Sequence, residues 1–362
     1  MRLIIAEKYA VGKALASTQL LDPTDHIVYT FGLGLWQEAR EELTFNQIPF
    51  TGYSGRMRST LSLLAKQNPN WRGGNKTLLC DAKLTPLFKS PTPDVSDEIL
   101  SSLMEHLNEQ LPFYEEIVLA VDHNRRGAHG AGQILERLTS VMLPPVRIMR
   151  FDAYSPKCLR DAWVTRSDNP WGNSAYDRAY QEQKLKRLFE HWWHTNATFV
   201  FGELCKKAQL KADPVITKYE FMLMGVLHQQ TSPPTADKLL DTMQRWEGTG
   251  LYLDRVPERH LRQIGSGGTQ STLVQKLVER GFAVEVEGSG TKPGRKRLAL
   301  SNVAERFMSM VHPKTFDPDL PMRLELWMRE RNIEAMRLYI NTIFGRQLRY
   351  QRKRSYPVSK VG

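Results

Sequence analysis

Residues 116–127 read EIVLAVDHNRRG, an apolar run that ends at an acidic residue and a polar loop containing a glycine. The run Glu116–Val121 has the pattern of a buried β-strand. The N-terminus repeats this arrangement, because the apolar stretch Arg2–Ala6 is followed at once by Glu7. Parallel strands present their carboxyl ends at one edge of a sheet, where such folds bind ligands. We therefore expect Glu7 and Asp122 to lie close together, where two carboxylates can hold a divalent cation.

Stretches with helical spacing separate the expected strands of the first 150 residues. They are Ala10–Ser17, Ser96–Leu111 and Ala131–Leu138, the last following the loop HNRRG. The alternation of strands and helices predicts a parallel sheet with helices on both faces.

The second part of the chain is mainly helical, with helices expected at about 215–229 and 235–246. A sharper pattern follows: a helix (STLVQKLVERG), a strand (FAVEVEG), a basic turn (SGTKPGRK), a second strand (RLALS) and a helix (NVAERFMSMV). This order is typical of a winged-helix DNA-binding unit. A small α+β unit whose turn is basic for another reason would show the same pattern.

Length and composition exclude several classes of protein. A chain of 362 residues favours two or three domains. No apolar run approaches the roughly 18 residues that cross a bilayer, and the N-terminus does not resemble a signal peptide. Cys80, Cys158 and Cys205 are too scattered for a disulfide framework or a cysteine-rich zinc site. We expect a cytoplasmic, nucleoid-associated protein with no membrane partner.

The net charge of +11 is unevenly distributed. Residues 1–150 hold 16 basic and 16 acidic side chains, whereas the remainder holds 34 basic and 23 acidic ones. The segment 346–360 has six basic residues and no acidic one. This asymmetry indicates that the second part of the chain binds a polyanion, most commonly nucleic acid. A basic surface that serves only solubility is the alternative.

The residues around the two strand ends resemble the TOPRIM domain of type IA DNA topoisomerases. That family opens with an apolar strand and a Glu-Lys pair, matched by Glu7 and Lys8, and its second acidic motif reads D-x-D-R-E-G, where this chain reads DHNRRG from Asp122. The stretch 155–160 (SPKCLR) is similar to the family's [ST]-P-K-x-[IL]-R, and 196–198 (NAT) to its N-A-T-R.

The resemblance extends into the second part of the chain. Residues 251–261 (LYLDRVPERHL) align without a gap with the nucleophile segment I-T-Y-P-R-[ST]-D-x-R-Y-L. Residues 265–282 (GSGGTQSTLVQKLVERGF) align with G-T-P-A-T-R and the helix that ends in E-R-G-[YF]. Only residues 262–264 separate the two segments, whereas a long arch separates them in the family. The shared order of these short motifs carries the resemblance.

The resemblance implies an α/β fold followed by mainly α structure, as in a type IA topoisomerase core that lacks most of the arch. A TOPRIM-like domain is expected at 1–153 and a helical domain at 154–212. A winged-helix-like domain is expected at 213–312, C-terminal helices at 313–345 and a basic tail at 346–362.

Several positions depart from the family's motifs in one direction. The second Asp of the metal motif is Asn124 and its Glu is Arg126, while Leu253 stands at the position of the nucleophilic tyrosine. The arginines of N-A-T-R and G-T-P-A-T-R are Phe199 and Gln270. Each change removes a charge or a nucleophile. A cation at a ligand position weakens Mg²⁺ binding, so any metal site at Glu7 and Asp122 is expected to be weak or absent.

We therefore predict a DNA-binding relative of these enzymes that prefers single strands and whose catalysis is reduced or lost. The alternatives are an active compact type IA topoisomerase, a TOPRIM nuclease, or an assembly subunit that contacts other DNA-processing proteins. No cofactor is expected, or Mg²⁺ if the protein is active. The resemblance places catalytic roles, if any, at Glu7, Lys8 and Asp122, and Tyr252, directly beside the nucleophile position, is the tyrosine that could take the nucleophile's role. DNA contacts are expected at Lys8, Arg125, Arg255, Arg259, Thr269, Gln270, Lys276, Lys292, Arg295, Lys296 and Arg297.

Overall fold

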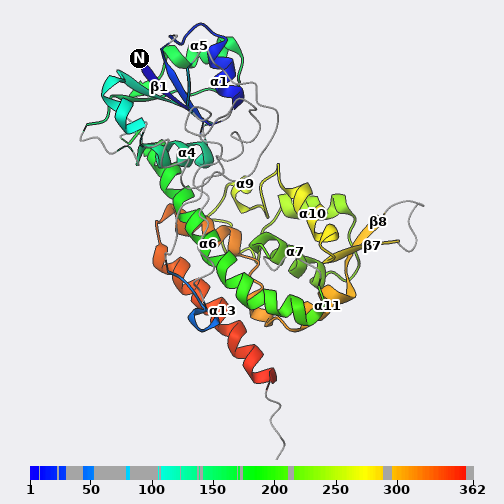
Figure 1. Cartoon of the computed structure of the whole chain (residues 1–362). Coiled ribbons are helices and arrows are strands. Elements are labelled where there is room, and N and C mark those ends of the chain that lie inside the picture. The colour runs from blue at the N-terminus through cyan, green and yellow to red at the C-terminus, as the bar shows by residue number, and fades with distance from the viewer. Residues whose placement is uncertain are drawn as a thin grey trace, which may run out of the picture. The chain divides into compact units, whose positions relative to one another are not determined.

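The structure is a computed structural model. It describes residues 1–7, 9–22, 24–29, 44–52, 79–81, 105, 107–122, 124–136, 138, 142–168, 170–171, 174–210, 216–287 and 296–355. The chain divides into two compact units, Met1–Glu38 with Ser54–Arg187, and Ala39–Tyr53 with Leu188–Gly362 (Figure 1). Lys8, Lys292 and Arg295, to which we assigned catalytic or DNA-binding roles, lie outside the described residues.

The first unit contains a six-stranded sheet in the order β3-β2-β1-β4-β5-β6. Its four central strands are parallel, and the two edge strands run antiparallel to their neighbours. The strands are β1 (Arg2–Ala6), β2 (His26–Tyr29), β3 (Leu79–Asp81), β4 (Glu116–Ala120), β5 (Val146–Ile148) and β6 (Ser167–Asp168). The expectation of an α/β fold built on a parallel sheet is confirmed.

Helices cover both faces of this sheet. The chain passes from β1 through α1 (Tyr9–Ala16) to β2, which lies on one side of the central pair β1 and β4. It passes from β4 through α4 (Arg125–Leu135) to β5, which lies on the other side of that pair. Because such crossovers are right-handed, α1 and α4 lie on opposite faces. Helix α5 (Pro156–Val164) packs against α1, as Figure 1 shows. Covered on both faces, β1 and β4 consist almost entirely of apolar, buried residues.

Helix α4 begins six residues earlier than the sequence pattern predicts. We expected residues 123–127 to form a loop and the helix to begin at Ala131. Instead, the side chain of Asn124 accepts hydrogen bonds from the main-chain N–H groups of Arg126 and Gly127, each at 2.9 Å. Such N-capping satisfies donors that the first turn of a helix leaves unpaired, and it allows the polar sequence from Arg125 onward to be helical.

The second unit is mainly helical. It contains the later part of α6 (Ser174–Ala208), and then α7 (Lys218–Gln229), α8 (Ala236–Gln244), α9 (Arg259–Arg262), α10 (Gln270–Glu279), β7 (Ala283–Glu287), β8 (Lys296–Leu300), α11 (Asn302–Ser309), α12 (Leu320–Arg329) and α13 (Ile333–Ser355). Its core is rich in aromatic rings, with Phe221 stacked between Phe201 and Phe316 at centroid distances of 4.6 and 4.5 Å. Helix α13 continues to Ser355, into the segment that we treated as a basic tail.

A small sheet and three helices form one side of the second unit. Strands β7 and β8 pair antiparallel, and Thr235, just before α8, forms an isolated antiparallel bridge with Arg297 on β8. Helix α10 packs against α8 and β7, and α7 packs against β8. In the part of the chain that the structure describes, no helix is long and apolar enough to cross a membrane.

Candidate functional site

The ends of β1 and β4 bring Glu7 and Asp122 together. These neighbouring strands connect onward to opposite sides of the sheet, which makes their carboxyl ends a topological switch point. The main-chain N–H of Asp122 donates to Glu7 Oε2 at 3.1 Å, and the N–H of Glu7 donates to the carbonyl of Ala120 at 3.3 Å. The expected juxtaposition is therefore present, with the Glu7 carboxylate buried and bonded to the chain.

Gly127 allows the start of α4 to approach these carboxylates. A Cβ at this position would lie 2.4 Å from the Asp122 carbonyl oxygen and 2.7 Å from Glu7 Oε2, distances that real side chains do not adopt. Only glycine therefore lets the first turn of α4 lie this close to Asp122 and Glu7. The positive end of the helix dipole faces the buried carboxylate of Glu7.

Tyr154 is a member of this site that sequence reasoning missed. Its hydroxyl donates to Asp122 Oδ1 at 3.0 Å. The tyrosine directly precedes the stretch 155–160, whose motif was noted, but nothing in the sequence pairs it with a strand end more than thirty residues earlier.

The two arginines after Asn124 differ in their surroundings. Arg125 Nε donates to Glu182 Oε2 on α6 at 2.6 Å, and the side chain of Glu182 is only 9% exposed. We expected Arg125 to contact DNA, and sequence reasoning did not foresee its pairing with Glu182. Arg126 is exposed on the first turn of α4.

The described residues do not fit a strong Mg²⁺ site. Asn124, which we aligned with a metal-ligand position from sequence, uses its side-chain oxygen to cap α4. Glu7 and Asp122 remain as oxygen donors, and the described residues contain no group of three or more His, Cys, Asp or Glu side chains that could hold a metal. Two carboxylates can retain Mg²⁺ when substrate phosphates supply further oxygens, but they do not form a protein cage for the ion.

Tyr252 lies in a turn before α9 and is packed rather than projecting into solvent. Its half-buried ring contacts a small apolar cluster that includes Val256 and Met322. Arg323 Cζ lies 5.2 Å from the centroid of the same ring. Leu253, which we aligned with the nucleophile position from sequence, is half-buried beside it.

The arginines that follow Tyr252 remain at the surface. Arg255 is exposed and forms an ion pair with Glu330 at 2.8 Å. Arg259, at the start of α9, is exposed, and within the described residues it has no ion pair.

The predicted DNA contacts around α10 divide into exposed and buried residues. Thr269 and Lys276 are exposed, whereas Gln270 is 1% exposed and points toward the carbonyl of Ile264, so its side chain does not reach the surface. Before α10, Gly267 and Gly268 are open, since a Cβ on either would meet no atom within 4 Å.

The two described basic residues of the hairpin also differ. Lys296 is exposed and pairs with Glu285 across the strands. Arg297 is half-buried, and its Nη1 donates to the carbonyl of Pro233 at 3.1 Å. Arg297 therefore holds the segment before α8 against β8, in addition to any contact with a ligand.

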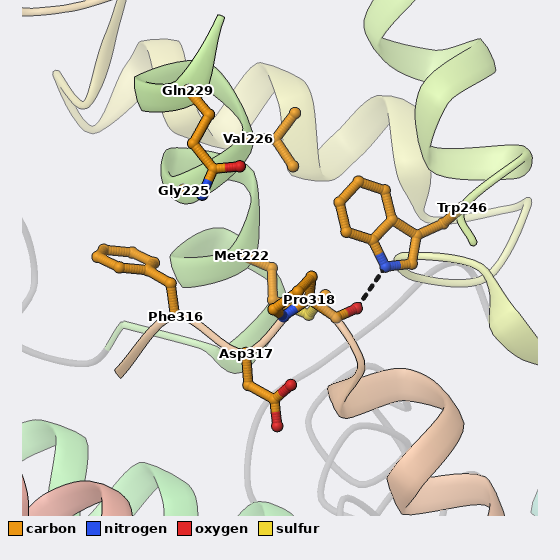
Figure 2. A pocket seen from close by; sticks show the side chains of 8 residues that line it. All are labelled: Met222, Gly225, Val226, Gln229, Trp246, Phe316, Asp317 and Pro318. Carbon is orange, nitrogen blue, oxygen red and sulfur yellow. Dashed lines mark hydrogen bonds between the residues drawn. The ribbon is translucent and has the colours of Figure 1, made fainter. Parts of the chain in front are cut away.

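A pocket lies between α7 and the segment 316–318 and contains none of the predicted site residues (Figure 2). Its walls are mostly apolar, with Met222 and Val226 on one side and Phe316 and Trp246 at the ends. Trp246 Nε1 donates to the carbonyl of Pro318 at 2.7 Å, which closes one side. With few polar groups in its walls, the pocket offers no catalytic chemistry of its own.

No protein-family model matches the chain, and no curated protein is significantly similar to it in sequence.

Proposed function

We propose that this protein binds single-stranded DNA and is a relative of type IA DNA topoisomerases in which catalysis is reduced or lost. The observation that carries the proposal is the arrangement of α8, α10 and the β7–β8 hairpin in the second unit. Helix α10 packs against the earlier helix α8 and leads directly into an antiparallel hairpin, and Thr235 forms an isolated bridge with Arg297 of that hairpin. Winged-helix units have this order, and they use the second helix and the hairpin to bind DNA.

Charge supports the same surface. Lys276 on α10 and Lys296 on β8 are exposed cations, and Arg259 lies in the segment that connects α8 with α10. The excess positive charge of the whole chain resides after residue 150. Phosphate contacts from such residues supply affinity without base preference.

Reduced catalysis is supported by the strand-end site. Asn124 caps a helix where the family's motif has a metal-binding carboxylate, and Leu253 has no group that can attack phosphorus. Without a well-formed cation site and a positioned nucleophile, strand cleavage loses both charge stabilisation and the covalent step.

An active enzyme is the second candidate, and one observation favours it. Arg323 lies over the ring of Tyr252, and a cation beside a tyrosine is what transesterification would need. This alternative requires the packed ring of Tyr252 to leave its apolar cluster, which costs burial of apolar surface.

Two assays test the proposal. Fluorescence anisotropy with single-stranded and duplex oligonucleotides should show tighter binding of the single strand, and equal or absent binding would contradict this. Incubation of negatively supercoiled plasmid with the protein and Mg²⁺ should leave the plasmid supercoiled. A denaturant-resistant adduct with DNA that disappears in Tyr252→Phe would establish the enzyme instead.

A further inference from the structure

A basic surface forms at the junction of α13 and the short 3₁₀ helix η5 (Pro313–Thr315), apart from the hairpin. Arg346, Arg349 and Lys353 are spaced by three and four residues, so they lie on one face of α13. Arg346 Nη1 donates to the main-chain carbonyl of Lys314 on η5 at 3.0 Å, which places Lys314 beside this part of α13. We call Lys314, Arg346, Arg349 and Lys353 the C-terminal basic surface.

These cations are available to a ligand. Lys314, Arg349 and Lys353 are exposed, and within the described residues none of them forms an ion pair. The one acidic residue of α13, Glu334, lies in its first turn and pairs with Arg337 at 2.6 Å. The nearest acidic residue after η5 in sequence, Asp317, is engaged with Arg323 at 3.3 Å. Among the described residues, no ion pair therefore neutralises Lys314, Arg349 or Lys353.

Two aromatic rings lie beside the cations. His312 and Tyr350 meet edge to face, with their ring centroids 5.1 Å apart, and both are half-buried. Partial burial lowers the pKa of His312, and the charges of Arg346 and Lys314 lower it further. The positive field acts on this ring and favours its neutral form. Cations interleaved with aromatic rings are the usual surface for single-stranded nucleic acid, since phosphates meet the cations and bases stack on the rings.

The surface is held in place before any ligand arrives. Gln347 is fully buried on α13. Its side chain accepts a hydrogen bond from the main-chain N–H of His312 at 2.7 Å and donates one to the carbonyl of Met310 at 3.0 Å. These bonds fix η5 against α13. A surface that is already ordered loses less conformational entropy on binding.

We propose that the C-terminal basic surface, with the rings of His312 and Tyr350, is a second binding surface for single-stranded nucleic acid, separate from α10 and the hairpin. Favourable interaction of cations with the end of the α13 dipole explains basic residues in the last turn. It does not explain the convergence of Lys314 from another element or the adjacent ring pair. Charge complementarity and the rings together favour a nucleic acid strand over an acidic protein surface.

The test combines charge removal with a salt series. The triple variant Lys314→Ala, Arg349→Ala, Lys353→Ala leaves Arg346 and its bond to η5 intact. For a labelled oligothymidine, loss of three phosphate contacts should reduce the slope of log K against log salt by about 2, and should weaken binding on the order of 10- to 100-fold at 0.1 M salt. The matched control removes three other exposed cations, Lys206, Lys207 and Arg306, and should change the slope by much less.

Stacking is tested separately. Tyr350→Ala should weaken binding about 5-fold or more with little change of slope, while Tyr350→Phe, which keeps the ring, should bind like the unmodified protein. Unchanged affinity and slope in the triple variant would overturn this proposal.

The double variant Lys276→Ala, Lys296→Ala distinguishes the two surfaces. If that variant binds weakly while the triple variant binds normally, the proposed function stands and the second surface does not. If only the triple variant loses binding, the C-terminal basic surface carries the DNA contact instead of the hairpin. A protein that binds no oligonucleotide at all refutes both.

Discussion

The side-chain amide of Asn196 pairs with the main chain of Phe50 in both directions. Its Oδ1 accepts from the Phe50 N–H and its Nδ2 donates to the Phe50 carbonyl, each at 2.7 Å. Asn196 is fully buried on α6, and nearby Trp192 Nε1 donates to the carbonyl of Gly52 at 2.7 Å. The asparagine of the N-A-T stretch thus anchors the segment 44–52 within the second unit.

Asn196→Ala should lower the free energy of unfolding by about 1–3 kcal/mol, because it leaves two partly buried main-chain groups of Phe50 without the partner they have in Asn196. Thr198→Ala is the matched control, since its hydroxyl bonds only to the His194 carbonyl within the same helix. Urea denaturation followed by circular dichroism measures both. Equal, small losses would show that the Asn196 pairing contributes little.

Gly127→Ala should destabilise the protein by about 1–3 kcal/mol, because the added methyl group would overlap the Asp122 carbonyl and displace the Glu7 carboxylate. Gly268→Ala provides a contrast, since its Cβ meets no atom within 4 Å, and its effect should stay within about 0.5 kcal/mol. Thermal denaturation compares the two. If Gly127→Ala melts like the unmodified protein, the start of α4 does not depend on close approach.

Calorimetric titration with Mg²⁺ should detect no sub-millimolar site, because within the described residues no third His, Cys, Asp or Glu side chain joins Glu7 and Asp122, and Asn124 is used as a cap. Asn124→Asp keeps a good capping residue and adds a carboxylate, so the fold should be retained. Sub-millimolar affinity that is lost in Asp122→Ala would contradict the interpretation of a degenerate metal motif.

The thiol of Cys205 should resist alkylation in the folded protein. Burial raises its pKa to about 12, and the nearby charge of Arg280 opposes this only in part. The thiolate, which is the reactive form, is therefore scarce at pH 8. Mass spectrometry after iodoacetamide treatment should show Cys158, which is half-buried, modified before Cys205. Denaturant should abolish the difference, and faster labelling of Cys205 in the native protein would refute the prediction.

The apolar runs predicted β1 and β4 correctly, because a strand that is buried on both faces consists of consecutive apolar residues. RLIIA and EIVLAV coincide with β1 and β4 to within one residue. The start of α4 was missed because its signal is one capping side chain, Asn124, in an otherwise polar stretch. By contrast, the proximity of Glu7 and Asp122 was predicted correctly, because the carboxyl ends of neighbouring parallel strands lie at the same edge of the sheet. The contacts of Tyr154 with Asp122 and of Glu182 with Arg125 depend on tertiary packing that no local pattern records.

The last prediction concerns the proposed contact between the hairpin and DNA. Removing Arg295, Lys296 and Arg297 together, as the sequence alone would suggest, mixes two effects, because the Arg297 side chain also bonds to the Pro233 carbonyl. Arg297→Ala should lower thermal stability as well as affinity. The double variant Lys276→Ala, Lys296→Ala removes only exposed cations, so it should melt normally. If both lysines contact phosphates of a single strand, the slope of log K against log salt should fall by about 1.4. The loss should be similar for oligonucleotides of different sequence, since phosphate contacts read no bases. A double variant with unchanged slope would remove α10 and the hairpin from the DNA-binding surface.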